Sequence, residues 1–278
     1  MSITGTGAEN DPYLVTTYTE LVSKAAESGK FTKLANNIDI YDEFPLGNPT
    51  QLIISGTVDG DNRTINHMTR TDSTIAIDIA RGGVLKNTNF KNIMTAISFM
   101  QTRVPSQDFN VIHDCSFAGR IEDGFVITRN GDNHLGKVSR CAFDVEGNML
   151  RLFADYTTTS KENLYVRLKT NDSYLTEGNA NSRNYTFANC YFDITAPNLT
   201  NFLNTTTALL VNCALDIKTS STLTLGTGST GATSIVNAAD GPLITAAGNV
   251  VSIAGDKWLD AQFLYDAGFD IIVPQQGE

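Results

Sequence analysis

The chain has 278 residues, of which 41% are hydrophobic, and its 30 acidic and 20 basic side chains give a formal net charge of −10 at pH 7. The apolar share suits a long packed core, yet no run approaches the roughly 18 consecutive apolar residues of a membrane-spanning helix. Phosphate binding requires clustered Lys and Arg, so duplex nucleic acid is disfavoured as the main partner. We therefore expect neither a nucleic-acid ligand nor membrane insertion.

Residues 1–33 are expected to form an opening segment and a capping helix. The helical pattern covers Thr17–Ser28, with Tyr18 and Leu21 on one face and Gly29 ending it. Such a helix would cover the first strands, whose unpaired backbone edge invites strand addition. Residues 31–40 and 51–57 predict these strands, and residues 58–65, VDGDNRTI, predict a turn-rich segment before the next one.

A six-residue pattern then recurs with a period near 25 residues, which is the signature of a solenoid. The interval of 49 residues between the anchor side chains Phe143 and Phe192 is about twice the others. One degenerate copy is therefore expected between them, with Leu168 near the anchor position. The clear copies are LKNTNF at 85–90, IHDCSF at 112–117, VSRCAF at 138–143, FANCYF at 187–192 and LVNCAL at 210–215.

The phase within each copy predicts two strands joined by a one-residue corner. Apolar residues stand three before and two after the fourth position, which is Thr88 in the first copy and Cys in the others. After this position the period is two, as in a strand, whereas the step of three before it leaves one extra residue. Asn and Asp readily enter the left-handed region that turns such a corner. The predicted corner residues are Asn87, Asp114, Arg140, Asn189 and Asn212.

The pattern resembles the coils of the right-handed parallel β-helix, or pectate-lyase-like, superfamily over roughly residues 34–255. This resemblance implies an all-β solenoid of about 8–10 coils, with the β-helix proper over residues 34–217. Residues 218–255, rich in Thr, Ser and Gly, would form final coils or a thin β segment. Residues 256–278 predict a short helical segment carrying Trp258 and Phe263, which would serve as a C-terminal cap or a docking segment.

The four cysteines are predicted to fill the core. Cysteines stacked on successive coils about 4.8 Å apart have parallel side chains, whereas a disulfide requires Cβ atoms that point toward each other. No CxxC pair occurs, and His67, His113 and His134 lack the spacing of zinc ligands. We therefore predict no metal and no cofactor.

The densest acidic cluster consists of Glu122 and Asp123, with Asp114 and Asp132 as further members. Two such acids on neighbouring coils could stand about 5 to 9 Å apart, as in glycosidases. Acids are common in the turns of an acidic solenoid, however, and the segments typical of pectate lyases or polygalacturonases are missing. The four acids are thus the only catalytic candidates, and the balance of the sequence favours a protein without catalytic residues.

The favoured function is a structural or receptor-facing bacteriophage virion protein on the particle exterior: a spike, fibre, tail or capsid-decoration component. GTGAENDPY at residues 5–13 resembles the start of many bacterial and phage β-helices, and MSITGTGAEN is unlike a secretory signal. Expected partners are other virion proteins, further copies in a trimer, and a host-surface glycan. The scaffold hosts unrelated functions, so two extracellular alternatives stay open: a polysaccharide-degrading lyase or glycosidase, and a bacterial surface adhesin.

Overall fold

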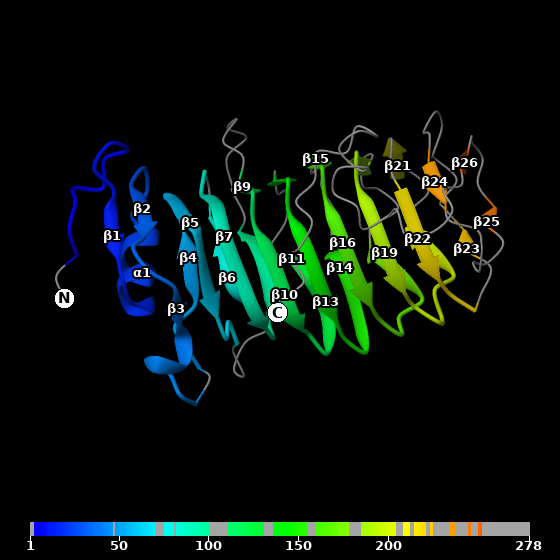
Figure 1. The fold of residues 1–278 in the computed structure, drawn as a ribbon, viewed down its shortest axis with the longest axis horizontal. Coiled ribbons are helices and arrows are strands. Elements are labelled where there is room, and N and C mark those ends of the chain that lie inside the picture. Colours follow the sequence, from blue (N-terminus) through cyan, green and yellow to red (C-terminus); the bar gives the residue numbers. More distant parts are fainter. Residues whose placement is uncertain are drawn as a thin grey trace.

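A computed structural model shows that the chain winds as a parallel β-solenoid, which confirms the predicted fold class (Figure 1). Its strands lie in three stacks, of which the first two form one 17-stranded sheet and the third a 9-stranded sheet. The structure describes residues 3–46, 48–69, 75–80, 82–100, 110–130, 136–154, 160–177, 185–203, 208–211, 214–220, 223–224, 234–236, 244–245 and 250–251.

Each stack collects strands from successive coils, and all of its pairings are parallel. The first stack consists of β1 (Tyr13–Val15), β2 (Phe31–Leu34), β5 (Thr57–Asn66), β7 (Val84–Ile93), β9 (Asn110–His113), β12 (Gly136–Ser139), β15 (Ser160–Glu162), β18 (Tyr185–Ala188) and β21 (Ala208–Val211). The long strands β5 and β7 continue into the second stack and join the two stacks into one sheet.

The second and third stacks form the other two sides of the solenoid. Besides β5 and β7, the second contains β3 (Ile38–Asp39), β10 (Ser116–Arg120), β13 (Ala142–Glu146), β16 (Tyr165–Lys169), β19 (Tyr191–Thr195), β22 (Ala214–Lys218), β24 (Ser234–Val236) and β26 (Val250–Val251). The third contains β4 (Leu52–Ile54), β6 (Ile75–Ile79), β8 (Ala96–Met100), β11 (Asp123–Asn130), β14 (Met149–Ala154), β17 (Tyr174–Glu177), β20 (Asn201–Leu203), β23 (Leu223–Thr224) and β25 (Ile244–Thr245).

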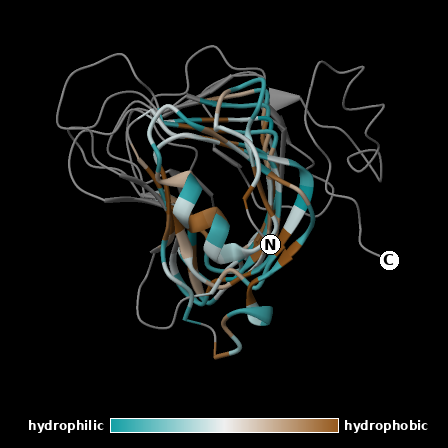
Figure 2. Ribbon diagram, turned by 90° about the vertical axis from the view of Figure 1, so that its left-hand side faces the viewer, coloured by the Kyte–Doolittle hydropathy of each residue, from teal (hydrophilic) through white to brown (hydrophobic). Residues whose placement is uncertain are grey.

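The N-terminal segment closes the first coil, as expected. Helix α1 (Tyr18–Ala25) lies across this end of the solenoid (Figure 2) and buries Tyr18 and Leu21 against the core. The side chain of Thr17 caps the helix by accepting a hydrogen bond from the backbone N of Glu20 at 3.2 Å. An antiparallel bridge between Thr4 and Leu14 covers the outer edge of β1.

The core repeats with the sequence period. The rings of Phe90, Phe117 and Phe143 stack on successive coils, with centroids 5.1 and 5.2 Å apart. The degenerate coil is present, but its anchor is Val166, which pairs with Phe143 on one side and Phe192 on the other. Leu168, which was expected near the anchor position, follows the anchor by two residues and is buried in the next inward position of the same strand.

Two other expectations have a clear outcome. Residues 58–65 were expected to be a turn-rich segment, but they lie within the single strand β5. Asp61 and Asn62, with φ of 50° and 61°, take up the irregularity while the pairing with β7 continues on both sides. In residues 218–255, β23 to β26 extend the second and third stacks, which favours final coils. The segment 256–278 lies outside the described residues. Among the residues that the structure does describe, no helix is long and apolar enough to cross a membrane.

Candidate functional site

The corner between the first and second stacks has the backbone that the sequence predicts. From the coil of β7 onward, each described corner residue has a positive φ, which places a one-residue turn between consecutive strands. Asn163 supplies this corner in the degenerate coil, whereas Asn212 lies outside the described residues. The corner residues and their φ angles are Asn87 (50°), Asp114 (54°), Arg140 (51°), Asn163 (55°) and Asn189 (53°).

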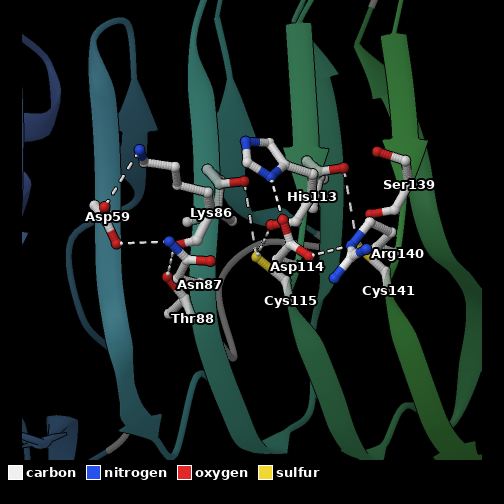
Figure 3. A network of polar contacts seen from close by, with 12 residues as sticks. Asp59, Lys86, Asn87, Thr88, His113, Asp114, Cys115, Ser139, Arg140 and Cys141 are labelled. Atoms are coloured by element: carbon white, nitrogen blue, oxygen red, sulfur yellow. Dashed lines mark hydrogen bonds and ion pairs between the residues drawn. The ribbon is translucent and has the colours of Figure 1, made fainter. Parts of the chain in front are cut away.

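A network of polar contacts runs along this corner, and its first part joins two coils (Figure 3). The carboxylate of Asp59 accepts a hydrogen bond from Asn87 Nδ2 at 3.1 Å and forms an ion pair with Lys86 Nζ at 3.3 Å. Thr88 Oγ1 donates to the carbonyl oxygen of Lys86 at 2.8 Å. The two contacts of Asp59 connect side chains of successive coils, so their role is to stabilise the stack.

The second part of the network is centred on Asp114, one of the predicted candidates. Its Oδ2 lies 2.7 Å from His113 Nδ1, and its Oδ1 accepts a hydrogen bond from Arg140 Nε at 2.6 Å. Burial raises the pKa of this carboxyl, but the contacts with His113 and Arg140 more than offset that effect, so the pKa lies below its usual value. Asp114 is therefore an ionised, doubly engaged carboxylate.

His113 and Asp114 resemble the orienting half of a catalytic triad, so the position of a nucleophile matters. Ser139 is the residue paired with His113 on the next coil. Figure 3 shows the His113 ring turned toward the coil of Lys86 and away from Ser139. These three residues therefore lack the serine-to-histidine contact through which a hydroxyl is activated.

The described cysteines are buried thiols that belong to no disulfide, as predicted for core side chains. The Sγ atoms of Cys115 and Cys141 donate to the carbonyl oxygens of His113 and Ser139, each at 3.2 Å. Burial raises the pKa of the Cys115 thiol well above its usual range, and neighbouring Cys141 adds to this effect. Among the described residues, no group of three or more His, Cys, Asp or Glu side chains could hold a metal ion.

The candidates Glu122 and Asp123 lie at the other end of β10, where the chain turns from the second stack into the third. The five-residue strand separates them from Asp114 by a distance on the order of 20 Å, far beyond the separation of a glycosidase pair. Asp123 Oδ1 accepts a hydrogen bond from the backbone N of Met149 at 3.2 Å. Asp132 lies outside the described residues. Of the three candidate acids that the structure describes, only Glu122 and Asp123 therefore lie at the same corner.

Glu122 forms part of a surface depression of about 400 Å³ that extends over three coils. Arg120 Nε donates to Glu122 at 2.6 Å, and Arg120 Nη1 lies 3.6 Å from Glu146 on the next coil. The coils approach each other closely here, so that a side chain on Gly147 would collide with the carbonyl oxygen of Ile121. The lining residues are Arg120, Glu122, Glu146, Gly147, Asn148, Lys169, Thr170 and Asn171.

Most of the depression was missed by sequence reasoning, although the sequence holds a signal for it. Glu122, Asn148, Asn171 and Asn198 occupy the same corner on successive coils, and all four are exposed. Asn171 Nδ2 donates to Asn148 Oδ1 at 3.1 Å, and Asn198 Nδ2 donates to the carbonyl oxygen of Asn171 at 3.2 Å. The polar residue that follows each of these strands of the second stack therefore marks a second ladder, in addition to the ladder at the first corner.

Comparisons with known proteins agree with the fold. No protein-family model matches the sequence, and no curated protein matches it. Among solved structures, the chain is similar to a "putative immunoglobulin A1 protease" from Bacteroides ovatus, with a TM-score of 0.54 and 13% identity over 94% of this chain and 89% of that one. At this identity the similarity concerns the fold alone. The chain is a parallel β-solenoid protein, and its function has to be inferred from its own residues.

Proposed function

We propose that this protein is a structural, receptor-facing component of a bacteriophage particle, located on the particle exterior and without catalytic activity of its own. The proposal depends on one observation above all: each described acid of the candidate set already has a partner. Asp114 contacts His113 and Arg140, Glu122 contacts Arg120, and Asp123 caps the backbone at Met149. Acids held in this way stabilise the coils, which is the role that the proposal gives them.

The architecture supports an exterior role. Stacked coils pair the strands with one another, and the opening segment covers the edge of the first coil. A rod of this kind exposes little unpaired backbone, which suits a part that meets solvent and host surfaces. The GTGAENDPY segment, which resembles phage and bacterial β-helices, contributes to this covering. Partners under this proposal are other virion proteins, two further copies in a trimer, and a surface glycan of the host.

The proposal can be tested on intact particles. Gold-labelled antibody against the purified protein should bind the exterior of purified phage particles, and light scattering should give three times the 30.1 kDa chain mass. Antigen found only in the host-cell fraction would refute the location, and a single-chain mass would refute the trimer.

One alternative has a specific observation in its favour. Glu122 and Glu146 lie on neighbouring coils and share Arg120, so two carboxylates face one depression. A glycosidase or lyase would use such a pair, and it would release reducing ends from host polysaccharide. Loss of that release in both Glu122→Gln and Glu146→Gln would replace the structural proposal with an enzymatic one.

A further inference from the structure

The charges of the corner depression cancel within it. Arg120 contacts both Glu122 and Glu146, and Lys169 adds a second positive charge, so two cations stand against two anions. Lys169 is exposed and has no ion pair with any residue that the structure describes. The depression therefore offers hydrogen-bonding groups without a local excess of charge. The chain around it has a formal charge of −10, which repels a polyanionic ligand at long range.

Amide side chains give the depression both donors and acceptors. The side-chain contact between Asn148 and Asn171 uses Oδ1 of Asn148 as the acceptor and Nδ2 of Asn171 as the donor. Both residues are exposed, and each amide has further hydrogen-bonding capacity, because an amide side chain carries both donor and acceptor groups. Asn198 continues the row on the following coil. Met149 follows Asn148 in the chain just outside the lining residues, and 44% of its surface is exposed, so one apolar side chain is accessible near the polar row. Hydroxyl groups on a ring with an apolar C–H face would match this combination.

The spacing of the row restricts the shape of the ligand. Asn148, Asn171 and Asn198 occur once per coil, and coils repeat about every 4.8 Å along the axis. A pyranose unit of an extended polysaccharide has a similar length. A polysaccharide lying parallel to the solenoid axis would therefore meet one amide side chain at each successive sugar.

We infer that the depression binds an uncharged polysaccharide, lying along the axis with about one sugar per coil. Asn148 and Asn171 hydrogen-bond the sugar hydroxyls, Lys169 donates a further hydrogen bond, and Met149 contacts a C–H face. The Arg120 pairs hold the walls in place and keep the site neutral. This inference rests on the proposed function, since it names the ligand that a receptor-facing particle protein would contact.

Binding of the purified full chain to an array of uncharged and acidic glycans tests the inference. The wild-type protein should bind uncharged glycans, and the best of these should retard it in native gel electrophoresis. Asn148→Ala/Asn171→Ala should weaken that binding about tenfold or more, because two hydrogen-bonding side chains are lost. Lys169→Met should weaken it less. The matched control is Asn36→Ala, another exposed asparagine that hydrogen-bonds a neighbouring backbone carbonyl, on the first coil.

Three results would overturn the inference: no binding to any uncharged glycan, stronger binding to acidic glycans, or equal binding by the double variant and the wild type. Urea unfolding of the variants checks that each one keeps the wild-type midpoint. The assay uses purified protein, so its failure leaves the antibody labelling of particles unaffected. A protein that binds uncharged glycans but is absent from particles would instead remove the virion proposal and keep the site.

Discussion

The stacked phenylalanines of the core should supply a large part of the stability, and Phe117 is the residue to test. Its side chain is 1% exposed and lies between the rings of Phe90 and Phe143, at 5.1 and 5.2 Å. Phe117→Ala removes a whole ring and leaves a cavity between two others. Such a change costs about 3 to 5 kcal/mol of unfolding free energy. The upper part of that range is expected here, because stacked contacts are lost on both faces.

Urea unfolding followed by circular dichroism measures this loss, and two variants serve as controls. Phe117→Leu keeps most of the volume and should cost less than about 1.5 kcal/mol. Met94→Ala changes an apolar side chain that is 56% exposed and should stay within about 0.5 kcal/mol of the wild type. The urea midpoint of Phe117→Ala should be lower than that of the wild type, while the dependence of the unfolding free energy on urea concentration should stay the same. A loss in Phe117→Ala no larger than that in Met94→Ala would refute the stacked core.

Three further outcomes are expected. At the degenerate corner, Asn163→Ala should cost about 1 to 2 kcal/mol, whereas Asn163→Gly should be nearly neutral, because only alanine is strained at a φ of 55°; equal urea midpoints would contradict the corner. The lowered pKa of Asp114 gives it a stabilising effect that is complete above the ordinary carboxyl value of about 4 and is lost as the pH falls through the lower folded-state value. Asp114→Asn should therefore lessen the decline of the melting temperature as the pH falls from about 5 to about 2. An unchanged decline would contradict the stabilising contacts of Asp114 with His113 and Arg140. Finally, Cys115, Cys141 and Cys190 should resist a thiol reagent until urea unfolds the chain, as peptide mapping would show; rapid native labelling of any of the three would exclude its buried position.

The first corner was predictable because its physics leaves a mark on single residues. A left-handed backbone favours Asn and Asp, and it shifts the apolar phase by one position. That shift placed even Arg140 in the corner, although arginine has no preference for this conformation. The degenerate coil was harder to align because its usual markers are replaced. Leu164 stands in the cysteine position, and Lys161 takes the inward position that Val138 and Phe187 occupy on neighbouring coils.

The candidate site was less predictable, since it depends on which corners face the same side. Asp114 and Glu122 are close in the sequence, yet an extended strand carries them to opposite ends of the second stack. Conversely, Glu122 and Glu146 are 24 residues apart and share Arg120. Sequence proximity is therefore a poor guide in a solenoid, where residues one period apart are the true neighbours. The row of polar residues after the strands of the second stack could have been found by comparing residues one period apart at both corners.

The bridge between Thr4 and Leu14 limits what can be added to the N-terminal end of the solenoid. The opening segment occupies the outer edge of β1 at Leu14, so a foreign strand could pair along that edge only by displacing this segment. Head-to-head association through strand addition at this edge is consequently disfavoured. Extra coils introduced in the middle of the molecule, by duplication or by design, would leave this closure intact.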